Sequence, residues 1–203
     1  MTEKLRLKTR EILLKVLNPL VKIIGKIKSP FVKERMALSY TPEILDTLQP
    51  LDIILSKSLG HLSNVFNPGK WKHAIIYLGI ENGIPMIAEA IGRGVIKRNL
   101  YECLADKNFI AICRTKEKLT KTAITKGVDF ANAQVGKGYD YDFDMFSGHK
   151  YQNFFCSELA YYTLKEAIPN LKFKLMKSLG VETVSPNDFY QADKHFDVVF
   201  ETK

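Results

Sequence analysis

The segment W-K-H-A-I-I-Y-L-G, residues 71–79, constrains the fold more than any other part of the chain. Both of its alternating faces are apolar, apart from His73 and the hydroxyl of Tyr77. Such a pattern is typical of a strand that is buried on both sides of a sheet. We therefore predict a central strand over His73–Ile80, with His73 at its mouth, rigidly held and still close to solvent.

Alternating apolar residues and turn signals predict the remaining elements. Further strands are expected at Ile53–Ser56, Pro85–Ile91, Val95–Lys97, Phe109–Arg114 and Phe196–Phe200. Helices are expected at Pro42–Leu48, Thr120–Gln134 and Cys156–Ala167, with a short one after Ser185-Pro186. Residues 136–151 lack periodicity and are interpreted as a loop. Together these elements predict an α+β domain with a mainly antiparallel sheet.

The N-terminal segment is basic and amphipathic. Residues 4–28 place apolar side chains at helical spacing, but Lys15, Lys22 and Lys26 interrupt them, so no uncharged stretch is long enough for export or for spanning a bilayer. We expect a helical extension over residues 1–30, divided at Pro19, followed by one domain over 31–203. The extension packs on its own domain or a partner, or it lies on an anionic membrane surface.

Charge and cysteine content narrow the class of protein. The chain has 203 residues, enough for one substantial core, and its net charge of +8 favours acidic partners. Of these, nucleic acid is disfavoured because no binding motif accompanies the charge. Three cysteines without a C-x-x-C pair suggest neither a disulfide framework nor a zinc site. We therefore expect a cytoplasmic protein, with peripheral membrane attachment through residues 4–28 as the open alternative.

Cys156 stands at the predicted start of a helix. A thiol reacts as its thiolate, and at its ordinary pKa of about 8.5 little thiolate exists at neutral pH. The free N–H groups and positive dipole end of a helix N-terminus stabilise this anion and a developing oxyanion. Asn153 ahead of the cysteine and Glu158 behind it support the helix start. The alternative is a small buried apolar side chain, which suits Cys103 and Cys113 better.

Four histidines are candidates for the base. His73 is favoured because it opens a hydrophobic strand. His149 lies seven residues before Cys156 and is the main rival. His195 and His61 are interpreted as surface residues, although His61 lies on a loop that leaves a substrate contact open.

Glu89 is a carboxylate inside an apolar strand, a position that is costly unless the charge is paired. A three-residue loop, Glu81-Asn82-Gly83, with Gly83 in the left-handed conformation, would set Ile80 opposite Ile84 and bring Glu89 beside His73 as a diagonal neighbour. A two-residue loop, Asn82-Gly83, would shift the pairing by one and send Glu89 to the opposite face. An outward Glu89 on an edge strand is the other alternative.

Six motifs occur in a fixed order between Leu48 and Phe200. They are L-x-P-x-D-I-I-L, W-K-H-A-I-I-Y-L-G, A-E-A-I-G-x-G-V, G-Y-D-Y-D-F, F-C-S-E-L and V-S-P-N-D-F. In these motifs the chain resembles circularly permuted NlpC-type papain-like cysteine hydrolases of the YiiX/YebB-like group, which are related to lecithin:retinol acyltransferase-like proteins. In that family the histidine and carboxylate precede the cysteine, as they do here.

The resemblance implies roles for three residues. His73, Glu89 and Cys156 match the family's base, orienting acid and nucleophile, and the implied reaction is acyl transfer through an acyl-enzyme at an amide, ester or thioester bond. It also implies a permuted papain-like domain whose sheet packs against the helix that bears the cysteine. Leu51 departs from the pattern, because the family usually has glycine before the aspartate at Asp52.

Further residues are candidates for contacts with the substrate or the oxyanion. These are Tyr139, Tyr151, Ser157 and His61. The run Asp140, Asp142 and Asp144 has the spacing of a calcium loop, but the glycine and distal glutamate of an EF-hand are absent. The proposed chemistry needs no metal or organic cofactor.

Three functions remain open at this point. The first is hydrolysis of an amide bond in a peptide-like or N-acyl substrate, and the second is acyl hydrolysis or transfer on lipids at a membrane surface. The third is a catalytically silent module whose cleft only holds a ligand.

Overall fold

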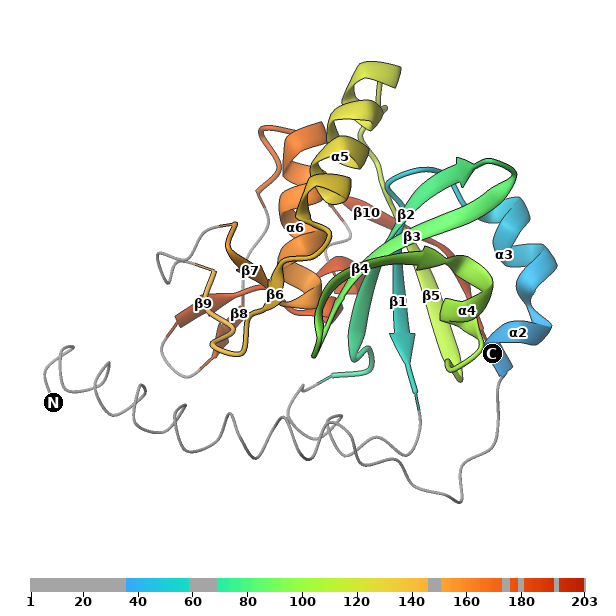
Figure 1. Cartoon of the computed structure of the whole chain (residues 1–203), viewed down its shortest axis with the longest axis horizontal. Helices are drawn as coiled ribbons and strands as arrows, with labels where there is room; N and C mark the ends of the chain where they lie inside the picture. Colours follow the sequence, from blue (N-terminus) through green and yellow to red (C-terminus); the bar gives the residue numbers. More distant parts are fainter. Residues whose placement is uncertain are drawn as a thin grey trace, which may run out of the picture.

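The computed structural model describes residues 36–58, 69–145, 151–172, 176–178, 181–191 and 194–202. Its centre is a six-stranded sheet with the order β10-β5-β1-β2-β3-β4, in which every neighbouring pair is antiparallel. The predicted α+β class with a mainly antiparallel sheet is confirmed. β2, the predicted central strand, lies between β1 and β3 (Figure 1).

The elements follow the predicted order closely. The sheet consists of β1 (Ile53–Lys57), β2 (His73–Glu81), β3 (Ile84–Ile91), β4 (Gly94–Asn99), β5 (Phe109–Thr115) and β10 (Phe196–Glu201). The helices are α2 (Met36–Ser39), α3 (Thr41–Thr47), α4 (Leu100–Leu104), α5 (Lys121–Gln134), α6 (Cys156–Ala167) and α7 (Pro186–Gln191). Two short ribbons, β6 (Gly138–Tyr139) with β7 (Asn153–Phe154) and β8 (Met176–Ser178) with β9 (Val181–Thr183), complete the fold.

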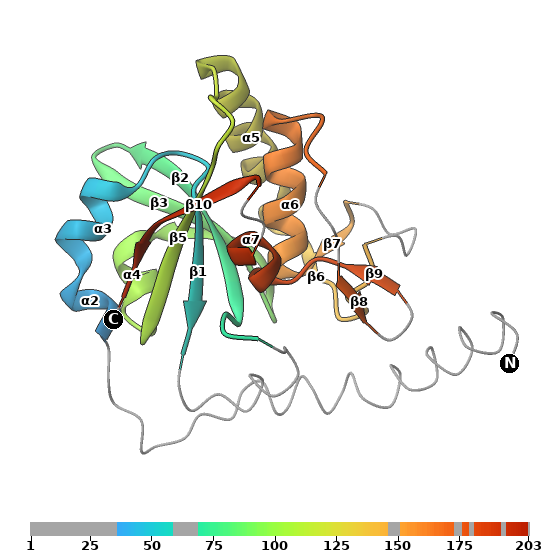
Figure 2. The ribbon, with the colours of Figure 1, turned by 180° about the vertical axis from the view of Figure 1, so that it is seen from behind.

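The sheet separates two apolar cores. Helices α5, α6 and α7 cover one face, and α2, α3 and α4 cover the other (Figures 1 and 2). We call the core on the first face the α6 core and the core on the second face the α4 core. Along β2, the α6 core contains Ala74, Ile76 and Leu78, and the α4 core contains Ile75 and Tyr77. Burial on both faces is what the uninterrupted apolar pattern of this strand predicts.

Some expectations need correction or lie outside the described residues. The interval 136–151, interpreted as a loop, contains β6, which pairs in parallel with β7. The strand expected at Val95–Lys97 is longer, and Asn99 caps the unpredicted helix α4 by accepting from the N–H of Glu102. The extension over residues 1–30 lies outside the described part of the chain. None of the helices described is both long and apolar enough to cross a bilayer.

The β2–β3 hairpin differs from the expected turn but keeps the expected register at the site. The turn has two residues, Asn82 and Gly83, and pairs Glu81 with Ile84, so the predicted three-residue loop was wrong. A bulge between Tyr77 and Gly79 then shifts the register by one, giving Tyr77↔Ile87 and Ile76↔Ala88. This is the register expected for Glu89 opposite Ile75. The bulge therefore cancels the shift made by the shorter turn.

Leu51 adopts a backbone conformation that ordinarily favours glycine. Its φ is 73°, and its N–H donates to the carbonyl of Tyr77 at 2.8 Å. A left-handed backbone costs an L-residue about 1–2 kcal/mol. Leu51 offsets this cost by burial, since its side chain lies against Gly127 of α5, where an added Cβ would come within 2.7 Å of it. The structure thus accommodates the leucine at a glycine position.

Gly79 adopts the positive φ that the bulge requires, and replacing it with alanine tests this requirement. Its φ is 106°, and an added Cβ would lie 3.3 Å from Pro50. Gly79→Ala is expected to lower the free energy of unfolding by about 1–3 kcal/mol, measured by urea denaturation, because both the backbone and the contact become strained.

Gly83→Ala is the matched control. Gly83 also has a positive φ, of 80°, but nothing lies within 4 Å of an added Cβ. Gly83→Ala is expected to lower the free energy of unfolding by less, about 1 kcal/mol. Equal losses in the two variants would contradict the importance of the close packing at the bulge.

Candidate active site

Cys156 is the first residue of α6, as the sequence predicted. Phe155 is the N-cap residue, and its backbone N–H donates to the carboxyl group of Glu158 at 3.4 Å. Cys156 is 6% exposed as a residue, so it lies just beneath the surface at the helix N-terminus. Its position lets the free N–H groups of the first turn face an anion there.

His73 and Glu89 contact each other across the β2–β3 pair. His73 Nε2 lies 2.7 Å from Glu89 Oε2, and the carboxylate is fully buried while the imidazole side chain keeps 19% exposure. Since Nε2 faces the carboxylate, Nδ1 is the ring nitrogen left for the thiol. The diagonal pairing expected from the sequence is therefore present.

The thiol and the imidazole form a coupled pair. Burial alone would raise the pKa of Cys156, but the charge of His73, a hydrogen bond with its ring and the backbone N–H of Ala74 lower it below its ordinary value. Burial would likewise lower the pKa of His73, but the charge of Cys156 and the hydrogen bonds with Cys156 and Glu89 raise it to about 9. The arrangement favours a thiolate beside an imidazolium at neutral pH.

Arg98 of β4 contacts the other carboxylate oxygen of Glu89. It was not identified from the sequence as a site residue. Its Nε donates to Oε1 at 2.6 Å, and its Nη1 donates to the carbonyl of Glu102 at 3.2 Å. Burial would raise the pKa of Glu89, but the hydrogen bond and charge of His73, then the charges of Lys107 and Arg98, lower it to about 2. The only available sequence signal was a cation two residues beyond Ile96, the partner of Glu89 on β4.

Asn187 binds the backbone two residues before His73. This residue was not identified from the sequence either. Its side chain accepts from the N–H of Trp71 and donates to the carbonyl of Trp71, both at 2.9 Å. Gly69 packs so closely on this amide that an added Cβ would lie 2.4 Å from its nitrogen. The motif V-S-P-N-D-F therefore fixes the start of β2, two residues before the imidazole.

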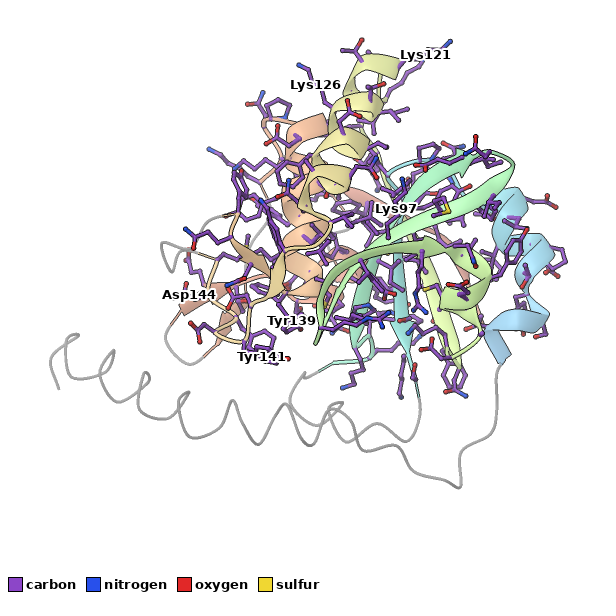
Figure 3. All side chains as sticks on the ribbon, in the orientation of Figure 1. Lys97, Lys121, Lys126, Tyr139, Tyr141 and Asp144 are labelled. Carbon is purple, nitrogen blue, oxygen red and sulfur yellow. The ribbon has the colours of Figure 1, made fainter. Side chains whose placement is uncertain are left out.

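The tyrosine candidates occupy different environments. Tyr139 of β6 is half-buried, and burial followed by the nearby charge of Cys156 raises its pKa well above the ordinary value. Its ring packs against that of Tyr141, with centroids 4.9 Å apart (Figure 3). Tyr151 instead belongs to an aromatic cluster with Phe130, Phe154 and Tyr162. Of the two tyrosines, Tyr139 is the one whose pKa is raised by the charge of Cys156.

Ser157 is buried, and its hydroxyl donates to the carbonyl of Val184 at 2.8 Å. The Ser157 side chain also contributes to the lowered pKa of Cys156, and its bond to Val184 connects the start of α6 with the C-terminal motif. His61 and His149 lie outside the described residues. His195 precedes β10, and its carbonyl accepts from Lys116, with β5 and β1 between this edge and β2.

The other two cysteines are fully buried apolar residues. Burial, with the charge of Glu89 as a second cause, raises the pKa of Cys103 to about 12, and burial with the charge of Asp52 does the same for Cys113. Their thiols therefore stay protonated. Cys156 differs in having an imidazole partner.

Glu158 is a second buried carboxyl group next to the site. Burial and the charge of Asp140 raise its pKa to about 8, so it is mostly protonated at neutral pH. Asp140 is itself 8% exposed and accepts from the N–H of Asp142 at 2.7 Å. Among the described residues, no group of three or more His, Cys, Asp or Glu side chains could hold a metal ion.

A fold of this topology, with a cysteine at the N-terminus of a helix, a histidine on a strand and a buried carboxylate, is that of a papain-like protein in permuted order. The family model for permuted papain-like amidase enzymes, YaeF/YiiX, C92 family, matches residues 47–200, and the chain belongs to this family. It is accordingly a cysteine hydrolase of the papain-like type.

One solved structure shares the fold. It is the metalloprotein yiiX from Escherichia coli O157:H7, at 19% sequence identity and a TM-score of 0.63, with 77% of this chain and 98% of that chain covered. No curated protein matches the chain.

The pH dependence of stability tests the His73–Glu89 pair. The pKa of Glu89, lowered from 4.5 to about 2, adds stability above pH 4.5 that is lost as the pH falls through 2. The raised pKa of His73, to which Cys156 contributes first and Glu89 second, adds stability below pH 6.5 that is lost as the pH rises through about 9. The difference in free energy of unfolding between wild type and Glu89→Gln, from urea denaturation, should therefore be largest between pH 4.5 and 6.5.

Glu43→Gln is the control, since Glu43 is exposed in the first turn of α3. Its effect is expected to stay within about 0.5 kcal/mol across the pH range. A Glu89→Gln effect that is equally flat would argue against an ion pair with His73.

Proposed function

We propose that the protein hydrolyses an amide bond of a peptide-like or N-acyl substrate through a Cys156–His73–Glu89 triad. The observation that carries this proposal is the continuous contact from thiol to imidazole to buried carboxylate at the N-terminus of α6. Membership of an amidase family supports the bond type.

In this mechanism the Cys156 thiolate attacks the carbonyl carbon, and the imidazolium of His73 protonates the leaving amine. The product of this step is an acyl-enzyme. Water attacks its carbonyl carbon while His73 takes a proton from the water, and the C–S bond then breaks, which releases the acid and restores the Cys156 thiolate beside the imidazolium. Glu89 keeps the ring oriented and stabilises the imidazolium, while the backbone at the head of α6 supplies donors for the oxyanion.

Tyr139 is the proposed additional oxyanion donor. Its raised pKa keeps the hydroxyl protonated, and the charge of Cys156 contributes to that raised pKa, which supports a role beside the developing anion. Ser157 and Tyr151 are less suited to this role, because the Ser157 hydroxyl already donates to Val184 and Tyr151 packs among aromatic rings.

Alkylation by iodoacetamide tests the nucleophile without knowledge of the substrate. At pH 7, Cys156 is expected to react faster than a free thiol, while buried Cys103 and Cys113 remain unmodified by mass spectrometry. His73→Ala should reduce the rate for Cys156 to that of a free thiol or below, because the charge and the hydrogen bond of the ring, the two largest causes that lower the pKa of Cys156 against burial, are then lost.

His195→Ala serves as the control for loss of a histidine and should leave the rate unchanged. The same variants are then assayed with N-acyl amide, peptide amide and glycerolipid ester substrates, with an acyl-enzyme trapped by acid quenching. If Cys156 reacts no faster than a free thiol, the result would favour a catalytically silent module that only binds a ligand. Turnover of the glycerolipid ester alone would favour the hypothesis of acyl hydrolysis or transfer on lipids.

The basic extension supports a second proposal, that an anionic membrane surface is a partner of the protein. Full-length protein is expected to sediment with vesicles containing phosphatidylserine but not with neutral vesicles. Replacing Lys15, Lys22 and Lys26 with Gln should weaken sedimentation at least several-fold, since each basic residue near such a surface contributes about 1 kcal/mol. Binding unaffected by these changes would leave packing against a protein as the role of residues 4–28.

A further inference from the structure

Three neighbouring strands each contribute one charged side chain to a row that ends at Cys156. His73 comes from β2, Glu89 from β3 and Arg98 from β4, with the carboxylate between the two cationic groups. The two carboxylate oxygens have separate partners, at 2.7 Å from His73 Nε2 and 2.6 Å from Arg98 Nε. Glu89 is thus held from both sides by side chains of the two neighbouring strands.

A buried carboxylate that has only a histidine as its partner faces a difficulty during proton transfer. When His73 gives up its proton, Glu89 would become an uncompensated charge in an apolar site, which is costly. Arg98 keeps its proton throughout, because a guanidinium is always charged in proteins. The Glu89–Arg98 pair therefore stays neutral while His73 changes between imidazole and imidazolium.

The remaining charged groups near Glu89 have other partners. Lys107 is buried, and its ammonium lies 2.9 Å from the carboxylate of Asp106. Cys103 of α4 is protonated, as its raised pKa requires. Arg98 is itself anchored by its donation to the carbonyl of Glu102 in α4. Lys107 acts on Glu89 by its charge, whereas Arg98 contacts the carboxylate directly.

We propose that Arg98 is a positioning residue that fixes the Glu89 carboxylate for His73 and thereby sets the reactivity of Cys156. This inference rests on the proposed triad. Arg98 acts only through Glu89, so its effect must vanish when Glu89 can no longer be charged. A purely structural role of Arg98 in the β3–β4 hairpin would persist in that background.

A double-mutant cycle separates the two roles. The rate constant for alkylation of Cys156 by iodoacetamide at pH 7 is measured in wild type, Arg98→Met, Glu89→Gln and the double variant, with folding checked by circular dichroism. Arg98→Met and Glu89→Gln are each expected to lower the rate about tenfold, the effect of losing one hydrogen bond to a charged group. The double variant should match Glu89→Gln.

Arg98→Lys tests rescue, because it keeps the charge but loses the planar fork. It is expected to react several-fold more slowly than wild type and faster than Arg98→Met. Should Arg98→Met not fold, the cycle is run with Arg98→Lys, which should have no effect in the Glu89→Gln background. Arg93→Met, at an exposed position in the β3–β4 turn, is the matched control and should react like wild type.

The outcomes distinguish failure of the inference from failure of the triad. An unchanged rate in Arg98→Met, or the same loss with and without the Glu89 carboxylate, would overturn the role of Arg98 and leave the triad standing. An unchanged rate in Glu89→Gln would overturn the proposed triad, and the role of Arg98 with it.

Discussion

The fully buried, ionised carboxylate of Glu89 sets the requirements for the rest of this structure. Such a group is tolerated only when both of its oxygens are paired, and here the partners are His73 and Arg98. The two partners come from the strands on either side, so β2, β3 and β4 must keep one register in this region. The α4 core, which includes Cys103, closes over this face of the sheet, and the charge of Lys107 further stabilises the carboxylate.

The register is maintained by two local features that compensate each other. Asn82 and Gly83, with φ of 52° and 80°, form the compact turn that an Asn-Gly pair favours, and this turn alone would have placed Glu89 on the wrong face. The bulge ahead of Gly79 shifts the chain back by one residue. The choice of a two- or three-residue turn therefore did not decide whether Glu89 meets His73. From the sequence, Gly79 was visible only as the end of an apolar strand, because a bulge depends on pairing between strands.

The parts of the site that could be predicted are those with a local signature. A polar residue opening an apolar strand identified His73, a carboxylate in an apolar run identified Glu89, and a helix start identified Cys156. Arg98 and Asn187 have ordinary local patterns, and their importance comes only from what lies opposite them in space. The same holds for Leu51. The cost of its left-handed backbone is compensated by packing of its side chain in the space left by Gly127, which lies 76 positions further along the chain.

Two buried carboxyl groups belong to the surroundings of this site, one as the partner of His73 and the other in the first turn of α6, and their environments give them opposite protonation states. Glu89 lies between two cationic groups and is ionised, with a pKa near 2, whereas Glu158 is buried beside Asp140 and has a pKa raised to about 8. An ionised Glu158 in the first turn of α6 would oppose a thiolate at Cys156 and weaken the electrostatic advantage of the helix N-terminus. Protonated, it still accepts from the N–H of Phe155 and supports the start of the helix without adding a negative charge beside the sulfur. Separation of the pKa values of two nearby acids by their surroundings is how one site can hold an anion and a neutral acid at the same pH. In this protein the separation favours a negative charge on the sulfur, in line with the lowered pKa of Cys156.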